Sequence, residues 1–308
     1  MDKQADPSAP RAPLRIGTRG SPLALKQAEI VRAALGGGDI VTVSTKGDRK
    51  QTVPLAALGG KGVWTKELEG ALLTGEIDIA VHSLKDVESE RPDGLCIAAV
   101  LPRGDVRDRL VGQASLSNLA AGMRIGTSSP RRAAQMQRLV PGLRIGILRG
   151  NVDTRLAKLA AGEVDATLLA SAGLERLGRA NVGWPLATEV MLPAPGQAAI
   201  GIECRADDTA TRAALTTIND SETFAAITAE RAFARALGGS CHSPVAALAS
   251  RDIEGFVLHA EILSEDGADC RSGARAFLAA DAEEAGTELA AELLSGAPAS
   301  ITSLFEAA

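Results

Sequence analysis

A short phrase occurs twice in this chain, and this repeat constrains the fold more than any other feature. The first copy, LRIGTRGSPLALKQA, begins at Leu14, and the second, MRIGTSSPRRAAQ, runs from Met123 to Gln135. Each copy reads as an apolar strand, then a small polar loop that contains Ser-Pro, then the start of a helix. This order of elements is typical of α/β folds.

The similarity continues downstream of both copies. The stretches KELEGALLTGEIDIAVHSLKD (residues 66–86) and TRLAKLAAGEVDATLLASAGL (residues 154–174) each predict a helix that ends at a glycine, Gly75 or Gly162, followed by a buried parallel strand. Two such units in tandem predict two similar α/β lobes with mostly parallel sheets. Lobes of this kind usually bind a ligand in the cleft between them.

Segments that contain proline connect the predicted lobes. Because LPAPGQAAIGIECR (residues 192–205) would return the chain to the first lobe, we expect lobe one to span residues 14–99 and 200–217 and lobe two residues 105–193. The first 13 residues, MDKQADPSAPRAP, have no apolar stretch of a secretion signal, and we expect a disordered tail.

A third region, residues 221–308, predicts a small α+β domain. We expect it to begin with a helix that Ser221 caps and that ends at Gly238. The stretch GFVLHAEIL then alternates like a strand, and DAEEAGTELAAELLSG has the pattern of an amphipathic helix.

Composition excludes several classes of protein. No apolar run among the 308 residues approaches the roughly 18 that a membrane span needs. The net charge of -5 and an aromatic content of 2% argue against a nucleic-acid binder. Four cysteines without a C-x-x-C pair and only three histidines give poor spacing for a metal such as zinc, so we expect no metal site. Because neither a secretion signal nor a membrane span is predicted, we expect a cytoplasmic protein.

Arginines and hydroxyl residues gather in the predicted loops and helix starts, where free backbone N–H groups attract anions. Arginine forks bind carboxylates or phosphates, so this pattern predicts an anionic ligand with several acidic groups. The alternative, a set of unrelated surface arginines, stays open. The residues are Arg19 and Ser21 in the first copy, Thr127, Ser128, Ser129, Arg131 and Arg132 in the second, and Arg149, Arg155 and Arg176 further along.

The stretch AVHSLKDV places His82, Ser83, Lys85 and Asp86 at the end of a predicted parallel strand, where α/β proteins carry their chemistry. A carboxylate among cations stays ionised and can stabilise a developing positive charge. The alternative is an Asp-Lys pair that caps the next segment.

Two glycine-rich loops complete the candidates. In GGSCHSP the glycines would let a bulky group approach Cys241, although an inert buried thiol is an alternative. The adjacent His242 does not make a cysteine protease, because neighbours in sequence rarely meet in the required geometry. The stretch RKQTVPLAALGGKGVWTKELE, with glycines around Lys61, predicts a mobile lid and lacks the order of a P-loop.

Taken together and in this order, these segments resemble the porphobilinogen deaminase (hydroxymethylbilane synthase) family. The resemblance covers nearly everything from Leu14 to Leu294. The matching phrases are RIGTRGSPLAL, GGKGVWTKELE, DIAVHSLKDV, GTSSPRR, LRGNVDTRL, LASAGLERLG, PAPGQAAIGIECR and the cysteine loop.

The resemblance implies a transferase of tetrapyrrole (haem) biosynthesis with two periplasmic-binding-protein-like lobes. It implies that Cys241 carries a dipyrromethane cofactor through a thioether, and that four molecules of porphobilinogen lose ammonia and are added head to tail before hydrolysis releases hydroxymethylbilane. Asp86 would stabilise the cationic methylene-pyrrole intermediate. The resemblance further implies a monomer whose partner is a small molecule, neither nucleic acid nor membrane.

The resemblance also assigns the binding residues. The carboxylates of cofactor and substrate would be held by Arg19, Ser21, Ser83, Lys85, Thr127, Ser129, Arg131, Arg132, Arg149, Arg155 and Arg176, with Gln27 and Gln197 nearby, and Lys61 and Trp64 would lie in the lid. The chain departs from the usual family residue at Ala57, Trp64, Pro130, Ser240 and His242.

Two other functions compete with this one. A two-lobed protein that binds an anionic ligand without catalysis would explain the lobes but not the cysteine loop. A protein that modifies nucleic acid would use the arginines on phosphates, but the acidic net charge and the few aromatic residues oppose it.

Overall fold

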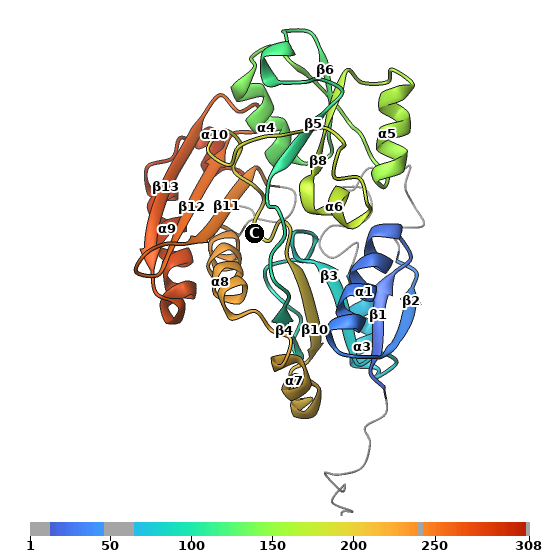
Figure 1. Ribbon diagram of the computed structural model, residues 1–308. Coiled ribbons are helices and arrows are strands. Elements are labelled where there is room, and N and C mark those ends of the chain that lie inside the picture. The colour runs from blue at the N-terminus through green and yellow to red at the C-terminus, as the bar shows by residue number, and fades with distance from the viewer. Residues whose placement is uncertain (1–12, 46–64, 239–242, 306–308) are drawn as a thin grey trace, which may run out of the picture.

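Three β-sheets organise the part of the chain that the structure describes. The computed structural model describes residues 13–45, 65–238 and 243–305. Two of the sheets have five strands each and the third has three (Figure 1). No helix within these ranges is long and apolar enough to cross a bilayer.

The first sheet builds lobe one around the first copy of the repeated phrase. Its strand order is β2-β1-β3-β10-β4, in which β1 is parallel to β2 and β3, and β10 is antiparallel to β3 and β4. The side chains of Ile16, Ile79 and Ile202 form part of its buried core. The strands are β1 (Arg15–Arg19), β2 (Asp39–Val43), β3 (Ile79–Ser83), β4 (Leu95–Val100) and β10 (Ile200–Arg205), and the helices are α1 (Pro22–Ala34), α3 (Lys66–Leu73) and α7 (Thr209–Thr216).

The second sheet repeats this arrangement in lobe two with the order β7-β6-β8-β5-β9. The register repeats as well, since Gly17 of β1 lies opposite Ala80 and Gly126 of β6 lies opposite Thr167. In each sheet the fourth strand is antiparallel and enters from the other lobe. The elements are β5 (Asp108–Val111), β6 (Arg124–Gly126), β7 (Arg144–Gly146), β8 (Ala166–Ala170) and β9 (Trp184–Pro185), with α4 (Pro130–Leu139), α5 (Val152–Ala160) and α6 (Ser171–Arg176).

The two copies of the repeat also begin their helices in the same way. Ser21 caps α1 by accepting a hydrogen bond from the amide of Ala24 at 3.3 Å, and Ser129 caps α4 through the amide of Arg132 at 3.4 Å. Proline, which needs no N–H partner there, occupies the first turn of both helices. Local sequence therefore determines both strand–loop–helix units.

The predicted glycine stops are confirmed. Gly75 and Gly162 follow α3 and α5 with φ of 72°, the left-handed region that glycine adopts without strain. Their amides donate to the carbonyls of Leu72 and Leu159, which satisfies part of each free helix end.

The third domain is the predicted small α+β unit. An antiparallel sheet, β11-β12-β13, packs its core, including Phe233, Phe256 and Leu289, against two helices. Its elements are β11 (Val245–Arg251), β12 (Phe256–Leu263), β13 (Cys270–Phe277), α8 (Ser221–Ala236), α9 (Ala282–Ser295) and α10 (Ala299–Thr302). The fold class expected from the sequence is thus confirmed.

One helix boundary differs from the expectation. Asp220, not Ser221, caps α8, because its carboxylate accepts a hydrogen bond from the amide of Thr223 at 2.8 Å. The amide of Asp220 is itself held by the carbonyl of Val100, which fixes it outside the helix. Ser221 is therefore the first helical residue.

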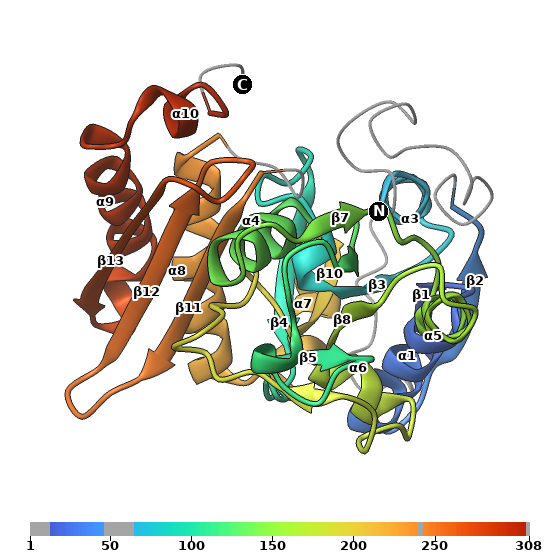
Figure 2. The same ribbon diagram turned by 90° about the horizontal axis from the view of Figure 1, so that it is seen from above.

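The third domain contacts lobe two through α4, which lies beside β11 and β12 (Figure 2). There Gln135 and Arg138 both donate hydrogen bonds to Glu261 of β12. The contact fixes the helix whose first turn carries the two adjacent arginines of the repeat.

A buried carboxylate joins the third domain to both connections between the lobes. Glu230 of α8, which is 0% exposed, accepts two hydrogen bonds from Arg103 on the outgoing connection, at 2.5 and 2.9 Å. It also accepts from the amides of Gly196 on the returning connection, at 2.7 Å, and of Ala249 in β11, at 2.8 Å. One side chain thus fixes three segments that are far apart in sequence.

Candidate functional site

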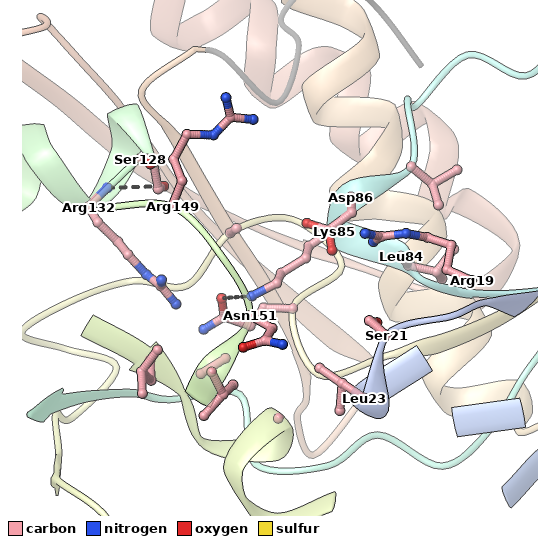
Figure 3. Close-up of a pocket in the computed structure, with 18 of the residues that line it drawn as sticks. Arg19, Ser21, Leu23, Leu84, Lys85, Asp86, Ser128, Arg132, Arg149 and Asn151 are labelled. Atoms are coloured by element: carbon pink, nitrogen blue, oxygen red, sulfur yellow. Dashed lines mark hydrogen bonds between the residues drawn. The ribbon is translucent and has the colours of Figure 1, made fainter. Parts of the chain in front are cut away.

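A cavity of about 660 Å³ lies between the two lobes and α8 (Figure 3). Its wall is formed by the turns after β1 and β3, the starts of α4 and α5, the returning connection and one face of α8. Among the described lining residues, seven cations outnumber three carboxylates; they are Arg19, Lys85, Arg131, Arg132, Arg149, Arg155 and Arg231, against Asp86, Glu88 and Asp153. This charge balance suits a ligand with several acidic groups.

Three helices begin at the cavity wall. The N-cap residues of α1, α4 and α5 are Ser21, Ser129 and Asn151, and all three line the cavity. The amide end of a helix carries a partial positive charge and favours anions. The repeated units therefore bring two similar anion-binding ends, one from each lobe, to the same space, and α5 adds a third.

Lys85 and Asp86 leave lobe one in a short 3-10 turn after β3. The turn is anchored by Leu84, which is 1% exposed, and is closed by a backbone hydrogen bond from Val87 to Leu84. Asp86 is exposed to the cavity, on the side from which Arg19 extends toward it (Figure 3). A carboxylate in this position can face a cationic group of a bound ligand.

Lys85 points to the opposite side of the turn. Its Nζ donates to Oε1 of Gln197 on the returning connection at 3.5 Å. Burial and the nearby charge of Arg132 lower the pKa of Lys85 to about 8. Lys85 is therefore mainly charged below about pH 8, and a bound carboxylate favours this charged form.

The adjacent arginines of the second copy have a partner that the sequence analysis missed. Arg131 and Arg132 are 3% and 5% exposed, and both donate hydrogen bonds to the carboxylate of Asp108. Burial alone would raise the pKa of Asp108, but the two guanidinium groups outweigh it and hold the pKa well below its ordinary value. The sequence contained one indication of this partner: Asp108 is an acid at the start of the apolar stretch DRLV. A buried charge requires a partner of opposite charge.

Arg231 of α8 is a second residue that the sequence analysis did not single out. Its guanidinium donates to the carbonyls of Val87, Glu88 and Ser89, at 3.1, 2.7 and 3.2 Å. These residues directly follow Asp86, so Arg231 fixes the segment that leaves the turn. No local pattern indicated this role, because about 140 residues separate the partners.

The binding and catalytic residues that were expected from the sequence, and that lie in the described ranges, divide into two groups. Arg19, Ser21, Lys85, Asp86, Ser129, Arg131, Arg132, Arg149, Arg155 and Gln197 line the cavity. Gln27, Ser83, Thr127 and Arg176 are not among its lining residues: Gln27 and Ser83 bond to each other at 2.9 Å, Thr127 accepts from the amide of Ser129, and Arg176 donates to the carbonyl of Ala198.

His82 points away from the cavity although it lies in the same stretch as Lys85 and Asp86. It is 5% exposed, and its Nε2 lies 3.0 Å from Glu203, which also accepts a hydrogen bond from Arg91. Alternation along β3 places His82 and Ser83 on opposite faces of the sheet. His82 is therefore part of a buried polar cluster in lobe one.

Three expected residues, Lys61, Trp64 and Cys241, lie outside the described ranges. The described residues nevertheless fit a cofactor with several carboxylates. Ser243, two positions after Cys241 in sequence, lines the cavity, and the buried Nε atoms of Arg131 and Arg132 have no hydrogen-bond partner among the described residues. Donors of this kind are usually satisfied, so the cationic wall has unused capacity for acidic groups.

Fold and cavity together define a class: a two-lobed α/β protein with a cation-rich cleft, extended by a third domain that closes one side of it. Family models match both parts, the dipyrromethane cofactor binding domain of porphobilinogen deaminase over residues 14–213 and the C-terminal domain over residues 224–295. The chain belongs to the porphobilinogen deaminase family.

Curated relatives agree over nearly the whole length. A porphobilinogen deaminase from Sphingopyxis alaskensis is 52% identical, with 97% of this chain and 98% of the relative covered. One from Paracoccus denitrificans is 46% identical, with 94% and 96% covered. Among solved structures, the methionine binding protein MetQ aligns with a TM-score of 0.42 at 13% identity, over 67% of this chain and 89% of that chain.

Proposed function

We propose that this chain is a hydroxymethylbilane synthase, a transferase that deaminates four molecules of porphobilinogen and joins them head to tail before hydrolysis releases the linear tetrapyrrole. The observation that carries the proposal is the cation-rich cavity with Asp86 at its wall, in a chain of this family. Each pyrrole unit brings two carboxylates, which accounts for the excess of cations. Family membership favours this enzyme over a binding protein without catalysis.

The cofactor is held by the described cations and attached at Cys241. When bound, dipyrromethane supplies the pyrrole carbon to which the first substrate is joined. Lys85, Arg149 and Arg155, together with the N-termini of α1, α4 and α5, bind the acetate and propionate groups. By fixing these groups they orient each ring, which converts an encounter in solution into a positioned reaction.

Asp86 acts at the reacting atoms. The aminomethyl group of porphobilinogen, protonated as an ammonium, leaves as ammonia with the electrons of its C–N bond, and the positive charge remains on the pyrrole nitrogen and methylene carbon of the substrate. The carboxylate of Asp86, exposed in the cavity, stabilises this charge. The bound pyrrole chain would supply the ring carbon for the new C–C bond, and the proton lost from that carbon would pass to the released ammonia or to water.

We also propose a cytoplasmic monomer without nucleic-acid or membrane partners. The proposal of a monomer follows from the family, and the described residues of both lobes and of α8 that line the cavity supply cations for the ligand within one chain. Cys96, Cys204 and Cys270 are free thiols, as is usual in the cytoplasm. The net charge of -5 opposes binding to nucleic acid.

Intact-mass measurement tests the proposed function. Freshly purified protein should be heavier than its sequence by one dipyrromethane, and Cys241→Ser should have the unmodified mass. Cys270→Ser is the matched control, because this half-exposed thiol lies on β13 of the third domain, and its loss should leave the addition in place. An active preparation with the unmodified mass would exclude the cofactor assignment.

A further inference from the structure

Asp108 is a buried carboxylate beside the cavity, although it does not line it. It is 0% exposed at the start of β5. Its Oδ2 accepts a hydrogen bond from Nη2 of Arg131 at 2.8 Å, and its Oδ1 accepts from Nη2 of Arg132 at 2.6 Å and from Nε2 of Gln197 at 3.1 Å. Two segments that form the cavity wall, the first turn of α4 and the returning connection, therefore converge on this one group.

The two arginines need this carboxylate in order to stay where they are. Adjacent guanidinium groups repel each other, and burial removes the water that would otherwise solvate them. The second guanidinium nitrogen of Arg131 donates to the carbonyl of Leu192, and that of Arg132 to the carbonyl of Leu168, both at 2.9 Å. Asp108 supplies the compensating negative charge, and the carbonyls fix the remaining direction of each fork.

Gln197 extends the influence of Asp108 to the opposite lobe. The amide nitrogen of Gln197 donates to Asp108 and, at 2.7 Å, to the carbonyl of Val106. With both N–H groups engaged, the amide oxygen faces Nζ of Lys85, 3.5 Å away. A chain of hydrogen bonds thus runs from β5 in lobe two to the residue beside Asp86 in lobe one.

The charged groups that act on Lys85 are Arg132, Asp86, Asp108 and Arg131. The two arginines lower its pKa, and the two carboxylates raise it. Asp86 is exposed and faces the ligand, whereas Asp108 is buried and keeps its charge at every working pH. Asp108 is therefore the permanent anion that favours the ammonium form of Lys85.

We propose that Asp108 is a positioning residue of this site: it holds Arg131 and Arg132 in place and, through Gln197, directs Lys85 at the acidic groups of the ligand. The inference rests on the proposed function, because the acidic groups are the carboxylates of the pyrrole chain. Asp108 acts only through these neighbours and touches no ligand.

The test is the pH profile of Asp108→Asn, which keeps the size of the side chain and removes its charge. Without Asp108, Lys85 loses its proton at lower pH. The fall of kcat/KM on the alkaline side should therefore begin about one pH unit lower than in the unchanged enzyme. KM at pH 8 should rise about tenfold, and kcat at saturation should change less. Asp108→Glu keeps the negative charge, so its KM should lie between that of Asp108→Asn and that of the unchanged enzyme.

Glu203→Gln is the matched control. Glu203 is also 0% exposed and is held by Arg91 and His82, but it belongs to the buried cluster of lobe one. Glu203→Gln should lower the free energy of unfolding and leave the pH profile of kcat/KM unchanged. A profile for Asp108→Asn that coincides with that of the unchanged enzyme, or an equal shift in Glu203→Gln, would overturn the proposal.

A further variant keeps the test decisive if Asp108→Asn does not fold. Gln197→Leu leaves both arginines on Asp108 but breaks the link to Lys85, so it should shift the alkaline limb in the same direction by a smaller amount. No shift in Gln197→Leu would then overturn the proposal. Failure of the proposed function is distinguishable, because the unchanged enzyme itself would then consume no porphobilinogen.

Discussion

At the residue scale, charges of opposite sign are kept apart within one turn. Asp86 is exposed to the cavity near Arg19, whereas Lys85 reaches across toward Gln197 and the arginines of lobe two (Figure 3). Arg231 fixes the carbonyls that follow the turn. This separation suits the proposed roles, in which the carboxylate stabilises a developing positive charge and the cations bind acidic groups.

Asp86→Asn should lower kcat about 10²- to 10³-fold, because the amide cannot stabilise the cationic pyrrole. KM and cofactor content should stay close to the original values, since the side chain is exposed and carries no structural hydrogen bond in the described structure. Steady-state kinetics and intact mass measure both. Asp153→Asn, which removes another cavity carboxylate paired with Arg179, serves as the control and should leave kcat nearly unchanged. Near-normal turnover of Asp86→Asn would contradict the assignment.

At the element scale, β10 supports the turn that carries Lys85 and Asp86. Gly201 of β10 leaves space for the side chain of Leu84, the anchor of that turn; an added Cβ would lie 2.3 Å from Leu84 Cδ2. Strand β10, the last strand of lobe one along the chain, therefore helps to fix the position of the candidate catalytic carboxylate.

Gly201→Ala should reduce the free energy of unfolding by about 1–3 kcal/mol through overpacking, and it should also lower kcat because Leu84 must move. Gly70→Ala is the opposite case. No described atom outside α3 lies within 4 Å of a Cβ added at Gly70, so this variant should gain about 0.5–1 kcal/mol of helix stability. Urea unfolding compares the two. Equal stability of both variants would show that Leu84 can move at no cost.

At the scale of the whole molecule, α8 connects the third domain to both lobes. Glu230 fixes the two connections between the lobes, and its neighbour Arg231 fixes the segment after Asp86. One helix thus contacts both connections between the lobes and the segment that follows Asp86.

Glu230→Gln should cost about 3–5 kcal/mol of stability, because it leaves the buried guanidinium of Arg103 without a counter-charge. Glu283→Gln is the control: it breaks an exposed pair with Arg235 and should cost at most about 1 kcal/mol. The free energy of unfolding in urea measures each effect. A loss below about 1 kcal/mol in Glu230→Gln would mean that the junction does not depend on this ion pair.

The sequence by itself determined the local units of this protein. Ser21, Ser129, Gly75 and Gly162 each form a hydrogen bond with a residue three positions away, so their effects can be predicted from spacing. The same locality explains why the repeated phrase predicted two matching lobes. The position of Asp86 after the end of a parallel strand could be predicted for the same reason, because the strand itself defines where it ends.

Only the tertiary structure decided which charges meet. Asp108 and Arg131 are 23 positions apart, and Glu230 and Arg103 are 127 apart, so no spacing rule connects them. The expected site arginine Arg176 lies outside the residues that line the cavity for the same reason, since its partner, the carbonyl of Ala198, belongs to the returning connection. Burial makes such pairs obligatory, but the choice of partner depends on how the lobes and the third domain pack.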